Sequence, residues 1–183
     1  MAADLKPPLA GYALWLLASG ARQNQLQSLV DDLSARAGTR RFLAHATLLG
    51  LLDYAGESAA NIVAEARALA QAAPPLELEL VGVGIRNAYF QALFLPIVPT
   101  APLMELHHEA RQRFHHEGDP PFLPHVSILY GDVHPAEKLR TFNRITERLP
   151  FPVPVTADQL AVVRVDGYPD AWTVEQTFPL GAL

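Results

Sequence analysis

Two stretches of the sequence share one pattern: residues 41–50 read RFLAHATLLG, and residues 121–131 read PFLPHVSILYG. Both follow Phe-Leu-x-His-x-(Thr/Ser)-(Leu/Ile)-Leu, with histidines at positions 45 and 125 that lie 80 residues apart in the chain. The chain therefore contains a degenerate internal repeat, and the other elements are interpreted around it.

Each copy of the repeat has the composition of a β-strand, in which successive side chains point to opposite faces. His45 and Thr47 are expected to share one face of the first strand, and His125 and Ser127 one face of the second. The apolar neighbours in each copy take the other face. Each strand is thus predicted to bury one face and to present an imidazole beside a hydroxyl on the other.

The rest of the chain alternates helical and extended patterns. Helices are predicted at 23–37, 57–73, 100–116 and 135–148, and strands at 12–17, 42–52, 76–83, 89–95, 122–130, 153–165 and 172–178. Several strand pairs are joined by short turns, which favours a mixed or antiparallel α+β fold over a doubly wound parallel sheet. The 16 prolines lie at element ends rather than in one linker. A single domain spanning residues 1–183 is therefore expected.

The amino-acid composition limits the kinds of molecule that the protein is expected to bind. The chain has 183 residues, with 14 basic and 19 acidic side chains and a formal net charge of −5. Long nucleic acid is not expected as a partner, because it is held mainly by neutralising phosphates with basic residues. The absence of cysteine excludes disulfides, thiolate metal sites and cysteine nucleophiles. No apolar run approaches the roughly 20 residues of a membrane span, so a cytoplasmic monomer without a membrane partner is expected.

Two histidine strands facing each other across a cleft would form a symmetrical acid–base site. Because imidazole has an ordinary pKa of about 6.5, one ring can be neutral and the other protonated near neutral pH. The neutral ring can take a proton from an attacking water while the protonated ring donates one to the leaving oxygen. The hydroxyls of Thr47 and Ser127 can bind the non-bridging oxygens of a phosphate. This chemistry suits a phosphodiester and needs no metal.

A lone histidine in an apolar strand is more often a buried residue whose ring is hydrogen-bonded to a neighbour. The repetition changes that balance. A structural duplication has a packing reason to preserve the hydrophobic pattern, but none to keep both the imidazole and the hydroxyl. The functional interpretation of His45 and His125 is therefore favoured.

In its two histidine motifs the chain resembles the two-histidine (2H) phosphoesterases, whose signature is a pair of His-x-(Thr/Ser)-x motifs. Within that family it is most similar to the cyclic phosphodiesterases of plant and yeast type. The further points of likeness are Tyr12-Ala13-Leu14-Trp15, Tyr89-Phe90-Gln91-Ala92, Pro124-His125-Val126-Ser127-Ile128-Leu129-Tyr130 and Ala171-Trp172-Thr173. The resemblance covers nearly the whole chain, from about Tyr12 to Leu180.

The resemblance implies a bilobal α+β fold with pseudo-two-fold symmetry, in which duplicated antiparallel or mixed sheets and flanking helices surround a central cleft. It implies metal-independent opening of a small cyclic phosphate without a cofactor. The implied substrates are nucleoside 2′,3′-cyclic phosphates, giving 2′-phosphates, and ADP-ribose 1″,2″-cyclic phosphate. His125 would be the base and His45 the acid, although the residues themselves do not distinguish these roles.

The same resemblance places Trp15, Tyr130 and Phe90 at the substrate. Composition alone would assign the aromatic residues to the core. Strand alternation also puts Tyr130 on the face opposite His125, so its ring reaches the site only if the strand ends or twists there, as Gly131 would permit.

Other features have plainer interpretations. His107, His108, His115 and His116 crowd one predicted helix, but the second histidine of a His-Glu-x-x-His zinc motif is replaced by Gln112, so solvated surface histidines are expected and no metal site. The basic pair Arg40-Arg41 could steer an anionic substrate or form a solvated edge. Arg86 and Arg164 have the same two interpretations.

Three alternatives remain open. An RNA-end-processing enzyme of the 2′-5′ RNA ligase-like branch would use the same motifs, but the net charge disfavours long RNA. A nucleotide-binding module of the same fold would bind without chemistry, and the presence of both histidines and both hydroxyls disfavours it. A metal-dependent hydrolase is the third alternative.

Overall fold

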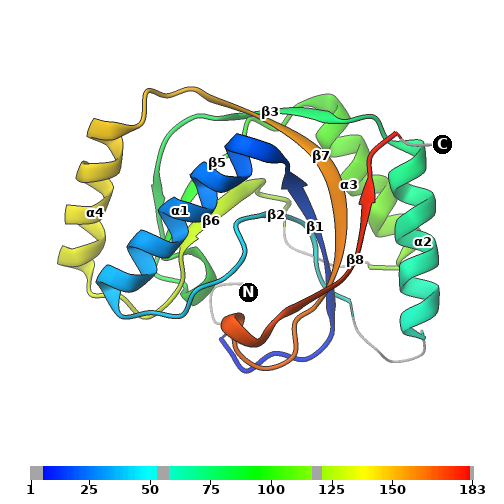
Figure 1. Cartoon of the computed structure of the whole chain (residues 1–183), viewed down its shortest axis with the longest axis horizontal. Helices are drawn as coiled ribbons and strands as arrows, with labels where there is room; N and C mark the ends of the chain where they lie inside the picture. Colours follow the sequence, from blue (N-terminus) through cyan, green and yellow to red (C-terminus); the bar gives the residue numbers. More distant parts are fainter. Residues whose placement is uncertain (1–5, 53–57, 117–120, 182–183) are drawn as a thin grey trace.

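The computed structural model describes residues 6–52, 58–116 and 121–181 (Figure 1). The strands in this part of the chain are β1 (Tyr12–Ala18), β2 (Ala46–Leu52), β3 (Leu76–Leu80), β4 (Gly84–Ile85), β5 (Leu93–Pro96), β6 (His125–Leu129), β7 (Val153–Arg164) and β8 (Thr173–Pro179). The helices are α1 (Gly20–Ala37), α2 (Ala59–Ala72), α3 (Ala101–Arg113) and α4 (Pro135–Arg148), with short 3₁₀ turns η2 (Tyr89–Gln91) and η3 (Pro169–Ala171).

The strands form one curled antiparallel sheet. Its order is β3-β7-β1-β2-β6-β5-β4, and β8 adds to β7. Helices α1 and α4 lie at one end of the sheet and α2 and α3 at the other (Figure 1). The predicted α+β class is therefore confirmed, because helices flank a sheet whose paired strands are antiparallel, although β1 and β2 are joined through α1 and β5 and β6 through α3.

The sheet is built from two equivalent units, β1-α1-β2-α2-β3 and β5-α3-β6-α4-β7. In each unit the first strand pairs with the second, β1 with β2 and β5 with β6. Each unit also lends strands to the other: β1 and β3 pair with β7, and the end of β3 bridges from Leu80 to Ile97, just after β5. Helix α1 packs on β6 while α3 packs on β2. The two units also meet where β2 lies beside β6.

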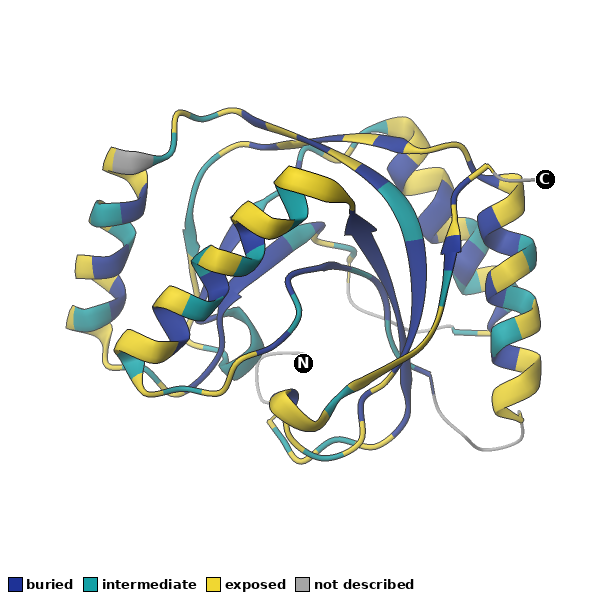
Figure 2. Ribbon diagram, in the orientation of Figure 1, coloured by how far each residue is buried: buried dark blue, intermediate teal, exposed yellow. Residues whose placement is uncertain are grey.

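Both faces of the central strands are buried. In β1, Leu14 and Leu16 belong to the main apolar core. Trp15 and Leu17 belong to a second, smaller cluster with Val163 of β7. The helices turn their buried sides to the sheet and their exposed sides outward (Figure 2).

The strand predicted at 42–52 begins only at Ala46. Side chains of α1 bind the preceding backbone: Gln27 Nε2 donates to the Phe42 carbonyl at 3.0 Å, and the Ala44 N–H donates to Gln27 Oε1 at 2.8 Å. Gln23 Nε2 donates to the Ala44 carbonyl at 2.8 Å. Because residues four apart on a helix share a face, Gln23 and Gln27 together replace a strand partner for this segment.

Other predicted boundaries shift as well. The strand predicted at 76–83 ends at Leu80, the strand predicted at 122–130 covers only His125–Leu129, and the helix predicted at 100–116 covers Ala101–Arg113. Helix α1 begins at Gly20, three residues before its predicted start. The strand predicted at 89–95 is divided into η2 and β5. The predicted start of the second helix, Glu57, lies outside the described residues, and α2 is described from Ala59, where the Ser58 side chain accepts from the Asn61 N–H.

Candidate active site

The register between β2 and β6 brings the two histidine motifs together on one face of the sheet. Ala46 pairs with Val126, so His45 lies opposite Ser127, and Thr47 lies opposite His125. Side chains directly opposite in an antiparallel pair have Cβ atoms about 4.5–5.5 Å apart, and diagonal ones about 7–8 Å. The sheet therefore places two imidazoles on one diagonal of a four-residue grid and two hydroxyls on the other.

This arrangement corrects one expectation. The motif strands do not face each other across a cleft but lie side by side within one sheet. The pseudo-two-fold relation passes between them, because each unit contributes the same strand to the junction. Adjacent strands bring the histidines together without any contact between separate sheets.

Backbone carbonyls fix the orientation of both rings. His45 Nδ1 lies 2.6 Å from the Leu43 carbonyl, and His125 Nδ1 lies 2.7 Å from the Leu123 carbonyl. Because a carbonyl oxygen only accepts, each Nδ1 carries the proton and donates it. The Nε2 atom of each neutral ring is thus left as an acceptor. The same local contact, two residues back along the chain, recurs in both units.

Burial makes both histidines weaker bases than usual. His45 is 5% exposed, and burial lowers its pKa to about 3, partly opposed by its bond to the Leu43 carbonyl; nearby His125 lowers it further. The pKa of half-buried His125 is also lowered, first by burial and then by Arg86, against the effect of the Leu123 carbonyl. At neutral pH both rings are neutral in the unliganded protein, whereas the sequence led us to expect one protonated ring.

An aromatic residue on the adjacent strand packs against each histidine. Trp15 is paired with Thr47 and stacks on His45, with ring centroids 3.5 Å apart and planes 6° from parallel. Phe94 occupies the equivalent position in the second unit: it is paired with Ser127 and meets the His125 ring at 5.2 Å and 71°. The site thus consists of two related triplets. The first is Trp15, His45 and Thr47, and the second is Phe94, His125 and Ser127.

Sequence reasoning missed Phe94, although a signal was present. The chain reads Leu-Trp-Leu at 14–16 and Leu-Phe-Leu at 93–95. The two aromatic residues precede their histidines by 30 and 31 positions. Extending the repeat upstream from the histidine motifs would have identified Phe94 as the partner of Trp15.

The other aromatic candidates gather beside the Trp15 triplet. Tyr130 follows the end of β6, where Gly131 has φ 127°, and stacks on Phe42 at 3.6 Å. Phe90 meets the Tyr130 ring at 5.1 Å. Tyr130 thus lies just beyond the strand, and its ring packs with Phe42 in the main apolar core. Its phenol is buried, which raises its pKa and keeps it neutral.

Trp172 joins this aromatic group. Its ring lies 5.9 Å from Trp15 and 5.8 Å from Phe90. Its indole N–H is buried and has no hydrogen-bond partner among the described residues. A buried donor without a partner is costly, so this N–H lowers the stability of the aromatic group.

The two hydroxyls differ in the unliganded protein. Ser127 is buried, and its Oγ donates to the Phe90 carbonyl at 2.8 Å. Thr47 is half-buried on the opposite strand. For Ser127 to donate to a phosphate oxygen its hydroxyl must rotate away from that carbonyl, because a hydroxyl has a single proton.

The sequence did not decide which arginines could bind an anionic substrate and which only lie on the surface. Arg40 binds both oxygens of Asp170 at 2.8 and 2.7 Å and packs over Tyr168, and Arg164 pairs with Glu175 at 3.0 Å. Arg41 is exposed. Arg86 instead turns toward the second triplet, where its guanidinium carbon lies 5.9 Å from the Phe94 ring centre.

The histidine-rich helix corrects another expectation. His108 and His115 are exposed, but His107 is buried and stacks on Phe122 at 3.8 Å. His107 Nδ1 lies 2.8 Å from the Leu48 carbonyl, and His116 Nε2 lies 2.9 Å from the Leu51 carbonyl. His107 is therefore not a solvated surface residue, because α3 packs on β2, and His116, beyond the end of α3, is partly buried. Within residues 6–52, 58–116 and 121–181, no cluster of three or more metal-binding side chains occurs.

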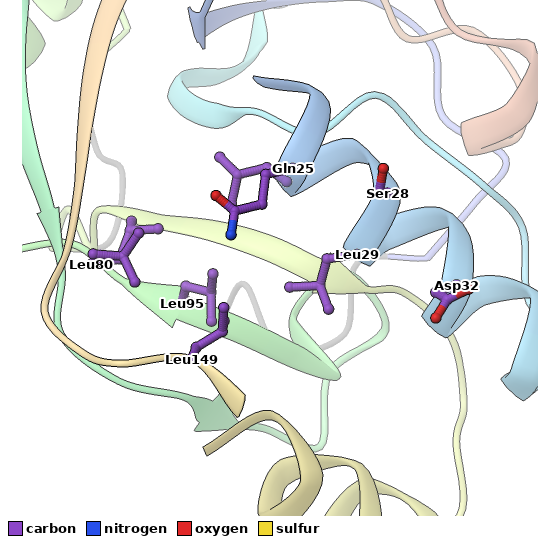
Figure 3. Close-up of a pocket in the computed structure, with 9 residues that line it drawn as sticks. Gln25, Ser28, Leu29, Asp32, Leu80, Leu95 and Leu149 are labelled. Carbon is purple, nitrogen blue, oxygen red and sulfur yellow. The ribbon is translucent and has the colours of Figure 1, made fainter. Parts of the chain in front are cut away.

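A separate cavity of about 400 Å³ lies beside α1 (Figure 3), and no histidine lines it. Leu26, Leu29, Leu80, Leu95, Leu149 and Val153 line most of it. Gln25, Ser28 and Asp32 form its polar edge on α1. It contains none of the four grid residues and offers no pair of acid–base groups.

Gly84 of β4 lets Phe94 approach His125. A Cβ added at this position would lie 2.3–2.8 Å from three carbons of the Phe94 ring. We expect Gly84→Ala to destabilise the protein by about 1–3 kcal/mol in chemical denaturation, because the buried ring must move. Gly50→Ala in β2 is the matched control, since nothing lies within 4 Å of its added Cβ. Equal stability of the two variants would contradict this packing.

Comparison with known proteins gives consistent matches. The model of the 2′-5′ RNA ligase superfamily matches residues 19–169. A curated protein named cyclic phosphodiesterase, from Arabidopsis thaliana, is 24% identical over 127 residues, which is 69% of this chain and 68% of that protein. These matches confirm the resemblance to the 2H phosphoesterases noted from the paired motifs.

Solved structures share the fold. The protein TT0787 of Thermus thermophilus superposes with a TM-score of 0.66 at 18% identity, covering 93% of this chain and 98% of that one. LigT of E. coli complexed with NADP+ gives a TM-score of 0.60 at 15% identity, covering 94% and 98%. The helices of the described residues include none long and apolar enough to cross a membrane.

Proposed function

Because the chain belongs to the 2′-5′ RNA ligase superfamily, we propose that it hydrolyses a small cyclic phosphate by acid–base catalysis with His45 and His125. Membership in this superfamily and the Arabidopsis relative support a phosphoesterase activity. The finer proposal is carried by one observation: the Ala46–Val126 register places both histidines and both hydroxyls on one face of the sheet.

In the proposed reaction, water attacks the phosphorus of a nucleoside 2′,3′-cyclic phosphate. His125 Nε2 takes a proton from the water as the new P–O bond forms. The bond between phosphorus and O3′ breaks, and O3′ receives a proton from His45 Nε2. The phosphate then remains on O2′. Thr47 and Ser127 donate to the non-bridging oxygens, where negative charge accumulates. No metal or cofactor takes part.

The neutral state of both rings in the free protein is compatible with this reaction. An anionic phosphate bound within a few ångström favours the charged form of imidazole and so raises its pKa. Stacking on Trp15 further favours a protonated His45, because the face of an indole ring attracts cations. In the proposal, His45 therefore becomes protonated when the substrate binds. It later gives this proton to the leaving oxygen.

The proposed substrate is a mononucleotide rather than long RNA, in keeping with the net charge of −5. ADP-ribose 1″,2″-cyclic phosphate is the second proposed substrate. Trp15, Phe90 and Tyr130 are proposed to contact the base or ribose. Trp15 is only 3% exposed, so its main contribution is to the His45 ring and Phe90 offers more free surface. The enzyme is proposed to act as a cytoplasmic monomer.

The decisive experiment is a product assay with 2′,3′-cyclic nucleotides that separates 2′- from 3′-phosphates. Formation of the nucleoside 2′-phosphate, undiminished by a chelator, is expected. Turnover of an oligonucleotide with a cyclic end, but not of the mononucleotide, would instead identify an RNA-end-processing enzyme. Loss of activity with the chelator would identify a metal hydrolase, and binding without turnover a nucleotide-binding module.

A further inference from the structure

The two triplets are related by pseudo-symmetry, but among the described residues only the second has a polar side chain at the reactive ring nitrogen. Gln91 Nε2 lies 3.4 Å from His125 Nε2. Gln91 Oε1 accepts a hydrogen bond from Arg86 Nη1 at 2.8 Å. This bond sets the orientation of the amide, because guanidinium nitrogens only donate and must face the oxygen of the glutamine. The amide nitrogen is therefore the atom turned toward His125.

An amide N–H beside Nε2 requires an unprotonated acceptor there. His125 Nδ1 already carries its proton, because it donates to the Leu123 carbonyl. In the protonated ring both nitrogens are donors, and the Nε2 proton would oppose the amide hydrogens of Gln91. The contact between Gln91 and His125 thus selects the ring state that can receive a proton from water.

A buried lysine holds the turn that carries Arg86. Lys138 of α4 is 4% exposed, and its Nζ donates to the Arg86 carbonyl at 2.8 Å. The Arg86 side chain is exposed but lies over Phe94, which itself contacts His125. Direct contacts therefore connect α4, the β4–η2 turn and the histidine in one continuous path.

We propose that Arg86 is a positioning residue that acts through Gln91 to keep His125 Nε2 an unprotonated acceptor. This inference rests on the proposed function, in which His125 is the base. Arg86, on the β4–η2 turn, is the charged group that lowers the pKa of His125. His125 in turn lowers the pKa of His45, which lies in the segment that leads into β2. Lys138, the nearby cation on α4, is directed to the Arg86 carbonyl.

The sign of the effect follows from charge and hydrogen bonding. Arg86 lowers the pKa of His125, so Arg86→Gln removes a positive charge and releases the Gln91 amide, and His125 holds its proton to higher pH. At acidic pH a larger share of the variant then has a protonated His125 that cannot accept from water. At alkaline pH His125 is neutral in both proteins, and this difference vanishes.

The test combines kinetics with a direct titration. We expect Arg86→Gln to lower kcat/KM for a 2′,3′-cyclic nucleotide several-fold more at about pH 5 than at about pH 8, since one unit of pKa corresponds to a tenfold change. Arg86→Lys, which keeps the charge and one donor, should restore most of the loss. Arg36→Gln is the charge control, because Arg36 pairs with Asp32 on the exposed side of α1.

The ring of His125 can be followed by NMR titration in labelled protein, which does not depend on turnover. Its midpoint should move to higher pH in Arg86→Gln, and further in Gln91→Glu, where a carboxylate faces Nε2. An equal loss of kcat/KM at both pH values with an unchanged midpoint would overturn the proposal and leave Arg86 as an anion-binding residue. Failure of the wild type to hydrolyse any cyclic phosphate would refute the proposed function, while the titration would still decide the role of Arg86.

Discussion

Replacing His125 or His45 by asparagine is expected to lower kcat/KM for a 2′,3′-cyclic nucleotide by about 10³-fold, because a positioned acid or base contributes roughly 10²–10⁴-fold. Asparagine is chosen because its amide N–H can keep the donor that each ring offers to the carbonyl of Leu43 or Leu123. The substitution removes Nε2, the atom that moves the proton in the proposed reaction. Steady-state kinetics with the mononucleotide measure the effect.

His107→Asn is the matched control for these variants. His107 is also buried and also binds a strand carbonyl, that of Leu48, but it belongs to α3 and stacks on Phe122. Its replacement should reduce stability and leave kcat within a few-fold of the wild type. A similar loss of kcat in all three variants would mean that the histidines serve the fold alone, and the acid–base proposal would have to be abandoned.

The second large effect concerns stability in acid. The pKa of folded His45 is lowered to about 3, mainly by burial, whereas a histidine in an unfolded chain has a pKa near 6.5. Between these values the unfolded chain binds a proton that the folded protein does not. The free energy of unfolding therefore falls as pH decreases from about 6.5 to 3, by up to about 5 kcal/mol from this group. Above about pH 6.5 the group makes no further contribution.

Chemical denaturation between about pH 7 and pH 4 measures this dependence. His45→Asn should reduce the slope of unfolding free energy against pH, whatever its effect on stability at neutral pH. The exposed His108 of α3 provides the control: His108→Asn should have the wild-type slope. If His45→Asn retains the full slope, His45 is not held as a neutral ring in the folded protein.

The sequence was sufficient to predict which side chains share a face. Alternation along a strand depends only on local geometry, so it placed His45 with Thr47 and His125 with Ser127. It could not tell which strands are neighbours. The expectation of facing strands was wrong because pairing between residues 80 positions apart is decided by the packing of the whole sheet.

The sequence also could not predict the pKa of the site histidines or the way in which the helices pack on the strands. The pKa of His45 depends on its 5% exposure, a property of every element packed around it. On α3, His107 lies beside the exposed His108, and the position of β2 makes His107 buried. The strand predicted at 42–52 begins only at Ala46, because glutamines of α1 bind the backbone of the residues before it. No local sequence pattern indicates this contact.

The joint between β2 and β6 has a mechanical consequence. The described ladder between these strands consists of the Ala46–Val126 pair, whereas β1 and β7 are paired over seven positions. The histidines therefore straddle a short junction near the middle of the sheet. A phosphate bound from both sides at this point would add a bridge across the shortest ladder between the two units, beside the β1–β7 and β3–β7 ladders that already join them.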